Sequence, residues 1–144
     1  MIKKIKNLEE MKKFAISVAN KTKIGKKATI FCLYGDLGSG KTTFTKGFVS
    51  AFGVKQNVTS PTFVIEKIYK LPKSLGKFKH IIHIDAYRLS GGEEMIELGW
   101  KEIIENPENI ILVEWPEKIA DILPKNIKKI EFTFVDEDKR IVNY

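Results

Sequence analysis

The sequence predicts a single α/β domain over residues 1–144, built on a mixed, mostly parallel β-sheet that is flanked by helices. Three observations indicate this fold class. The 144 residues are enough for one hydrophobic core and too few for two. Nearly continuous β-prone runs at 28–34 and 110–114 are typical of strands buried on both faces of a parallel sheet. Helical patterns alternate with the strands along the chain, which is the order of an α/β unit.

The N-terminal part of the chain supplies two helices and a strand. Residues 8–20 carry apolar side chains at spacings of three and four, which predicts an amphipathic helix. The strand at 28–34 follows, and a glycine-rich turn leads from it into a second helix at about 41–52. Gly53 stands where the C-terminal stop of that helix is expected.

The middle of the chain predicts a pair of strands. Residues 62–70 alternate between apolar and polar side chains, as a half-buried strand does. The segment 71–77 contains Pro and Gly and is expected to form a turn. We therefore expect 62–70 and 79–85 to pair as antiparallel neighbours.

The C-terminal part completes the sheet. Residues 92–105 have a helical pattern, and the apolar strand 110–114 follows them. Pro116 is expected to open a short helix that ends before Pro124. Residues 126–144 alternate on both sides of an acidic turn, which predicts a β-hairpin.

The charge of the chain is basic and comes from lysine. The formal net charge is +7, with 23 Lys and 2 Arg against 18 Asp and Glu. Basic proteins often bind nucleic acid or an acidic partner. Proteins that contact bases directly tend to use Arg for bidentate bonds, and this chain has almost none. We therefore favour a general lysine bias in composition over a nucleic-acid site.

The composition also bears on the cellular setting. No apolar run approaches the roughly 20 residues that cross a bilayer. The charged N-terminus lacks the continuous apolar stretch of a signal peptide. Cys32 is the only cysteine, which excludes an intrachain disulfide and favours a reducing compartment. We expect a cytoplasmic protein without a membrane partner.

A phosphate-binding motif is the strongest chemical signal in the sequence. Residues 35–42, GDLGSGKT, match G-x-x-x-x-G-K-[ST] after a buried strand and before a helix. Glycines let backbone N–H groups turn around phosphate oxygens, and the helix N-terminus favours the same anions. Lys41 is expected to reach the outer phosphates of ATP or ADP, and the Thr42 hydroxyl to bind Mg²⁺. The expected nucleotide-binding residues here are Gly35, Asp36, Leu37, Gly38, Ser39, Gly40, Lys41, Thr42 and Thr43.

Two carboxylates are candidates for the metal and the attacking water. Asp85 ends the strand HIIHID, and Glu114 ends the strand IILVE. The carboxyl ends of strands border the ligand crevice of an open α/β sheet. Because either carboxylate could hold Mg²⁺ while the other orients water, the residues alone leave the assignment open.

Three further positions have alternative interpretations. The loop at 58–63 contains hydroxyl side chains and is either a nucleotide-sensing switch or an ordinary Ser-Pro turn. His83 lies two residues before Asp85 on one strand, so it could support the site or be structural. Trp115 either covers the nucleotide or belongs to the core.

Taken together, the segments GDLGSGKTTFTKGF, SPTF, HIDAYRL, EEMIELGWKEII and ILVEWPEKI resemble the TsaE family, also described as YjeE. The resemblance covers about residues 8–135. It implies a single-domain P-loop NTPase that hydrolyses ATP to ADP and phosphate with Mg²⁺, slowly when alone. It also implies that TsaD and TsaB are partners, which transfer threonylcarbamoyl to an adenosine of tRNA. ATP turnover would reset their complex, and tRNA would be reached only through it.

The resemblance also implies roles for individual residues. Glu114 matches the second magnesium residue beside Thr42, and Asp85 matches the acidic residue needed for hydrolysis. Thr62 matches the switch threonine, and Trp115 matches the tryptophan beside the nucleotide. The expected catalytic residues are therefore Asp85, Glu114 and Thr62, and the expected metal ligands are Thr42 and Glu114.

Other functions compete with this interpretation. A small P-loop metabolite kinase usually needs a lid with Arg residues, and only Arg88 and Arg140 are present. A GTPase normally carries N-K-x-D after the phosphate loop, and this motif is absent from the sequence. A nucleotide-gated binding module would bind ATP without needing turnover. Arg88 itself could stabilise the transition state, face a partner or form a salt bridge.

Overall fold

The computed structural model describes residues 1–59, 61, 65–72 and 77–144. Within these residues one mixed sheet has the strand order β1-β7-β6-β2-β5-β4-β3. The strands are β1 (Ile2–Ile5), β2 (Thr29–Tyr34), β3 (Glu66–Lys70), β4 (His80–Asp85), β5 (Asn109–Glu114), β6 (Lys128–Phe134) and β7 (Arg140–Asn143). The helices are α1 (Leu8–Lys21), α2 (Lys41–Ala51), α3 (Gly92–Glu97), α4 (Trp100–Glu105) and the 3-10 helix η2 (Pro116–Ile122).

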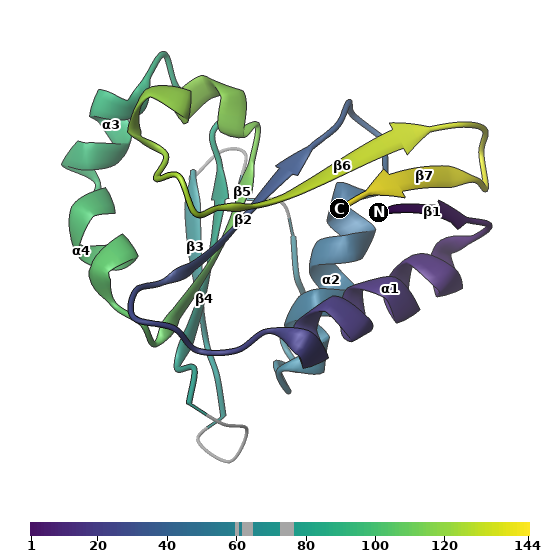
Figure 1. Cartoon of the computed structure of the whole chain (residues 1–144), viewed down its shortest axis with the longest axis horizontal. Coiled ribbons are helices and arrows are strands. Elements are labelled where there is room, and N and C mark those ends of the chain that lie inside the picture. Colours follow the sequence, from purple (N-terminus) through teal and green to yellow (C-terminus); the bar gives the residue numbers. More distant parts are fainter. Residues whose placement is uncertain (60, 62–64, 73–76) are drawn as a thin grey trace.

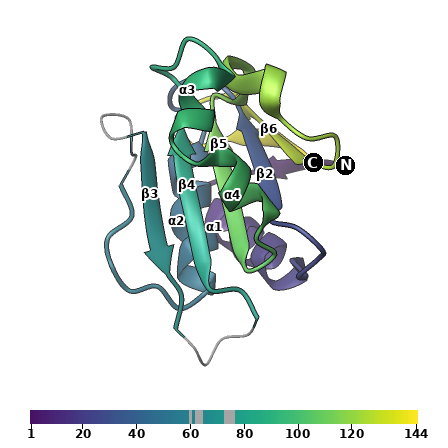
Figure 2. The same cartoon turned by 90° about the vertical axis from the view of Figure 1, so that its left-hand side faces the viewer.

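Helices cover both faces of the sheet, as Figures 1 and 2 show. Helices α1 and α2 pack on one face, and α3, α4 and η2 lie on the other. The side chains of β2 alternate between the two cores, with Phe31 and Leu33 on the α1–α2 side and Ile30 and Cys32 on the opposite side. This two-sided burial confirms the expectation for residues 28–34.

The sheet is mixed, as the sequence predicts. Its four central strands, β6, β2, β5 and β4, are parallel neighbours. Strand β3 pairs with β4 in the antiparallel sense, which confirms the predicted pairing of these two segments. Strands β6 and β7 form the predicted terminal hairpin. Strand β1 was not predicted, and it pairs with β7.

Two elements differ from the sequence prediction. The single helix expected at 92–105 is wrong, because α3 and α4 are separate helices joined through Gly99. Gly99 has φ +91°, a left-handed conformation that ends one helix before the next begins. Strand β3 begins at Glu66, later than expected, and Ile65 before it has φ 68°. Residues 62–64 of the predicted strand and 73–76 of the predicted turn lie outside the described residues.

The remaining expectations for local structure are met. Helix α1 begins after Asn7, whose side chain accepts a hydrogen bond from the N–H of Glu10 at 2.9 Å, a normal N-cap. Helix α2 ends at Ala51, and Gly53 beyond it has φ +83°. Pro116 opens η2, which is a 3-10 helix.

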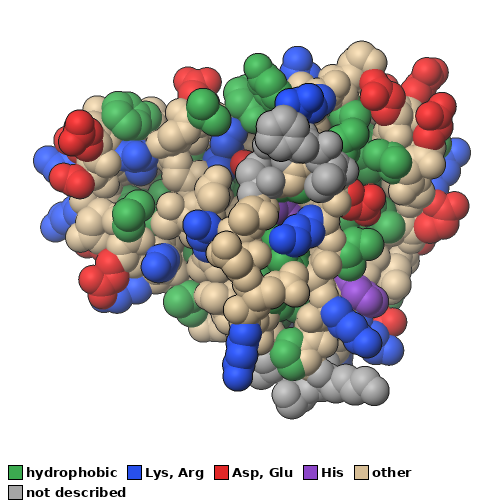
Figure 3. All heavy atoms as spheres, turned by 180° about the vertical axis from the view of Figure 1, so that it is seen from behind, with side chains coloured by type: hydrophobic (Ala, Val, Ile, Leu, Met, Phe, Trp, Pro, Cys, Tyr) green, Lys and Arg blue, Asp and Glu red, His purple; other side chains and the backbone are tan. Residues whose placement is uncertain are grey.

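Basic side chains do not gather into one cluster on the face of the molecule that Figure 3 shows. There, Lys and Arg side chains are spread among acidic, apolar and other side chains. In the part of the chain that the structure describes, no helix combines the length and apolar character needed to cross a membrane.

Candidate functional site

The phosphate-binding motif forms the connection between β2 and α2, at the carboxyl edge of the parallel strands. Two of its glycines have left-handed backbone angles and little space for a side chain. A Cβ on Gly35, which has φ +152°, would lie 2.7 Å from the carbonyl oxygen of Phe132. A Cβ on Gly40, which has φ +106°, would lie 2.7 Å from Cε of Met11. A side chain at Gly35 would therefore meet the backbone of β6, whereas at Gly40 the left-handed φ is what disfavours other residues, since the end of the Met11 side chain can move.

Lys41 is the buried cation of the site. Its residue is only 5% exposed, and its Nζ donates to the carbonyl of Gly35 at 2.5 Å. The same ammonium lies 4.2 Å from the centre of the Trp115 ring, a cation–π contact. A buried ammonium with one carbonyl and one ring as neighbours is well suited to an anionic ligand.

The two predicted carboxylates lie side by side. Asp85 ends β4 and Glu114 ends β5, and the two residues are register partners in the parallel pair. Both residues are 4% exposed. One oxygen of Asp85 accepts a hydrogen bond from the backbone N–H of Tyr87 at 3.0 Å, which fixes the carboxylate beyond the strand end. The expectation that both carboxylates share one edge of the sheet is met.

His83 contacts Glu114. Its Nε2 lies 2.6 Å from Oε2 of Glu114, and both side chains are buried. An ionised carboxylate can only accept, so a bond to ionised Glu114 requires the hydrogen on Nε2. Among the described residues, Nδ1 of His83 has no hydrogen-bond partner. The structure shows that His83 contacts a predicted site residue, and its support of the site stays a prediction.

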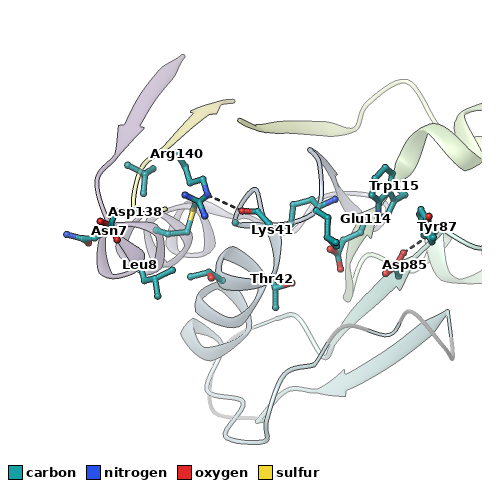
Figure 4. A pocket seen from close by; sticks show the side chains of 16 residues that line it. Asn7, Leu8, Lys41, Thr42, Asp85, Tyr87, Glu114, Trp115, Asp138 and Arg140 are labelled. Atoms are coloured by element: carbon teal, nitrogen blue, oxygen red, sulfur yellow. Dashed lines mark hydrogen bonds between the residues drawn. The ribbon is translucent and has the colours of Figure 1, made fainter. Parts of the chain in front are cut away.

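The side chains of Lys41, Asp85, Glu114 and Trp115 line one elongated cavity of about 540 Å³. Figure 4 shows Lys41 and Thr42 in its middle, with Asp85, Tyr87, Glu114 and Trp115 towards one end. Asn7, Leu8, Asp138 and Arg140 lie towards the other end. The full lining is Ile5, Asn7, Leu8, Met11, Leu37, Gly38, Gly40, Lys41, Thr42, Thr43, Asp85, Tyr87, Glu114, Trp115, Asp138 and Arg140.

The other predicted site residues take different places. Gly35, Asp36 and Ser39 belong to the loop but do not line the cavity. Ser39 is buried, and its hydroxyl has no hydrogen-bond partner within the described parts of the chain. Thr62, the predicted switch threonine, lies outside the described residues, as does Ser60.

Trp115 is a cavity residue that also touches the core. It has a left-handed backbone with φ 56°, which lets the chain turn sharply from β5 into η2. The side chain is partly buried against the core on the α3 side of the sheet. Its ring centre lies 5.1 Å from that of Tyr87, at 56° between planes. The structure shows the core contact and places the ring at the cavity, and the role of covering a nucleotide stays a prediction.

Sequence reasoning missed the residues at the far end of the cavity. Asn7 and Leu8 come from the start of α1, and Asp138 and Arg140 come from the terminal hairpin. These elements reach the phosphate loop because β1 pairs with β7, and β7 with β6. No local pattern in the sequence indicates that long-range pairing. Tyr87 was also missed, although its place two residues after Asp85 is a usable signal.

The donor set fits a hard divalent cation. The cavity holds the hydroxyl of Thr42 and the carboxylates of Asp85 and Glu114, all oxygen donors of the kind that Mg²⁺ prefers. Within the described ranges, no group of three or more His, Cys, Asp and Glu side chains could hold a metal by itself. Magnesium in phosphate-loop sites takes further ligands from nucleotide phosphates and water.

The chain matches known proteins over nearly its whole length. Residues 5–142 match the model of the family described as threonylcarbamoyl adenosine biosynthesis protein TsaE. A TsaE protein of Rickettsia bellii is 38% identical over 94% of this chain and 88% of its own length. A TsaE protein of Borreliella burgdorferi is 40% identical over 88% of this chain and 85% of its own. The crystal structure of a Bacillus YdiB protein superposes with a TM-score of 0.77 and 32% identity, covering 99% of this chain and 82% of that one.

Proposed function

This chain belongs to the TsaE family of threonylcarbamoyl adenosine biosynthesis proteins, and from this we propose that it is an Mg²⁺-dependent ATPase acting in threonylcarbamoyladenosine modification of tRNA. The observation that carries the ATPase proposal is the meeting of Lys41 with Asp85 and Glu114 in one cavity. Phosphoryl transfer to water needs charge stabilisation and a positioned water, and little else from the protein.

Each cavity residue has a proposed task. Lys41 binds the outer phosphates. Its ammonium then gives up the hydrogen bond to the carbonyl of Gly35 and donates to phosphate oxygens instead. Thr42 and Glu114 hold Mg²⁺, which when bound neutralises charge on the phosphates. Asp85 orients the attacking water, since its carboxylate is fixed by the N–H of Tyr87.

His83 keeps the Glu114 carboxylate in place for the metal. A carboxylate bound by a neighbouring N–H loses rotational freedom, so it presents its free oxygen in one direction. The contact between Nε2 and Oε2 is short and buried, which suits this task.

The proposed partners are TsaD and TsaB, with tRNA reached through them. Family membership supports this proposal. Three apolar side chains at the cavity are also strongly exposed: Leu37 at 91%, Leu8 at 66% and Tyr87 at 53%. Exposed apolar groups beside a nucleotide site would let a partner sense whether the site is filled. A tRNA-modifying role and the unpaired Cys32 support a cytoplasmic location.

The test is phosphate release from ATP by the purified protein, alone and with TsaD and TsaB added. We expect slow release that rises with the partners and requires Mg²⁺. Asp85→Asn, which preserves side-chain size, should lower the rate by about a hundredfold while ADP affinity stays within about twofold. Glu97→Gln, on an exposed face of α3, is the matched control and should behave as wild type.

The alternatives predict other results. A metabolite kinase would transfer the phosphate to an acceptor rather than release it, and a GTPase would prefer GTP in competition. If no phosphate is released in either condition while ADP still binds, the protein is a nucleotide-gated binding module. Normal turnover by Asp85→Asn would remove Asp85 from the mechanism.

A further inference from the structure

Arg140 joins the terminal hairpin to the phosphate loop. Its Nε donates to the carbonyl of Gly38 at 3.2 Å, although the two residues are 102 positions apart. Its Nη1 donates to the carbonyls of Asp136, at 2.5 Å, and Lys139, at 2.9 Å. The guanidinium is therefore held by its own hairpin on one side and holds the loop on the other. Figure 4 shows the bond from Arg140 to the loop as a dashed line.

The segment that Arg140 contacts has little other support. Leu37 is 91% exposed. Gly38 has φ +80°, and no atom lies within 4 Å of the position where its Cβ would be. The turn bond from the N–H of Ser39 to the carbonyl of Asp36, at 3.1 Å, is local. A glycine in open space can adopt many conformations, so an external contact is needed to hold one of them.

The aliphatic part of Arg140 also lies near a second glycine of the loop. Its Cγ is 3.8 Å from the position that a Cβ on Gly40 would take, and Cε of Met11 is 2.7 Å from that position. Gly40 is the residue before α2, where the N–H groups of the helix start. Arg140 thus bonds Gly38 and lies near Gly40.

The backbone of Arg140 is held between two neighbouring strands. Arg140 opens β7, where it is the register partner of Ile5 in β1 and of Phe134 in β6. The guanidinium carbon lies 4.6 Å from the centre of the Phe134 ring. A residue between two paired strands has little freedom to move away from the loop.

We infer that Arg140 is a positioning residue that braces the phosphate loop in the conformation that receives polyphosphate. This inference rests on the proposed nucleotide site. A loop that is already ordered loses less conformational entropy when its N–H groups close around phosphate, so the brace raises affinity. The donors of a guanidinium lie in a rigid plane, so its bonds to carbonyls have fixed directions, whereas the three N–H donors of a Lys ammonium rotate.

The test compares Arg140→Met, which keeps the aliphatic stem, with Lys139→Met, which removes one positive charge from the same hairpin. Affinities for ADP and for inorganic tripolyphosphate are measured by calorimetry with Mg²⁺. We expect Arg140→Met to weaken both ligands about tenfold, the loss of one charge-assisted hydrogen bond. Lys139→Met should stay within about twofold, since the ion pair that its side chain forms with Asp136 is exposed. Hydrogen exchange at the amides of 37–41 should quicken in Arg140→Met alone.

Three results would overturn the inference. Unchanged affinities in Arg140→Met would show that the loop needs no brace. A loss for ADP without a loss for tripolyphosphate would make Arg140 a contact to the nucleoside instead. Equal losses of affinity in Arg140→Met and Lys139→Met would show that only the positive charge of the hairpin matters. If Arg140→Met does not fold by circular dichroism, Arg140→Lys replaces it, with a smaller loss in the same pattern expected.

Lys41→Ala separates this inference from the proposed function. If Lys41→Ala binds ADP normally, the nucleotide site itself is wrong. If Lys41→Ala loses ADP while Arg140→Met keeps it, only the role of Arg140 fails.

Discussion

The bond between His83 and Glu114 can be measured by a double-mutant cycle. The perturbations are His83→Ala, Glu114→Ala and the double variant. Each single change also leaves a cavity and alters the charges around Asp85, so neither change alone reports the bond. In the cycle those separate effects cancel, and the coupling free energy between the two side chains remains.

The structure sets the size of that coupling. The two atoms are 2.6 Å apart, slightly shorter than the roughly 2.7–2.9 Å that is usual for charge-assisted N–H···O bonds. His83 is 1% exposed and Glu114 is 4% exposed, so water screens the contact little. Hydrogen bonds to charged groups contribute about 1.5–3 kcal/mol, and we expect a coupling of about 2 kcal/mol. That is a sizeable part of the roughly 5–15 kcal/mol that stabilises a domain.

The assay is urea denaturation of the wild type and the three variants at one pH, followed by circular dichroism. Because Glu114 is also the proposed magnesium ligand, the same proteins are titrated with Mg²⁺ in the presence of ADP. We expect His83→Ala, in which Glu114 is still present, to lower the affinity for Mg²⁺ about tenfold. This is the lower end of the loss in metal affinity on removing a partner of a metal ligand.

A coupling below about 0.5 kcal/mol would refute the reasoning, because it is less than any buried charge-assisted bond should give. A strong coupling with an unchanged Mg²⁺ dependence would leave the bond structural and remove its proposed role at the metal.

Two further predictions concern single side chains. In a Trp100→Phe background, the fluorescence of Trp115 should change on ADP binding, because the Lys41 ammonium 4.2 Å from its ring turns to phosphate; a flat titration would contradict that movement. Burial raises the pKa of the Cys32 thiol from 9.0 to about 12, so a thiol reagent at pH 8 should label the folded protein on the order of a thousandfold more slowly than the urea-unfolded one. Labelling of the folded and unfolded protein at equal rates would place Cys32 at the surface. Since the folded thiol has the higher pKa, its contribution to stability is present below pH 9.0 and decreases above it.

Local patterns were sufficient for most of the fold. The apolar runs at 28–34 and 110–114 predict buried strands, because only a strand covered on both faces needs so few polar side chains. The phosphate motif identifies Lys41 and Thr42, and strand-end position identifies Asp85 and Glu114. The helix pattern at 92–105 failed at Gly99, because periodicity continues across a left-handed residue that breaks the helix.

The sequence by itself therefore determined the α/β class, the phosphate loop and the two carboxylates, since each of these depends on neighbours within a few residues. Only the tertiary structure decided that His83 bonds Glu114 and that Arg140 bonds Gly38. Both contacts follow from the order and register of the strands. The sheet brings together His83 and Glu114, which are 31 positions apart in the sequence, and Arg140 and Gly38, which are 102 positions apart. Strand pairing is a competition among all strands for the most favourable burial, so no single segment encodes it.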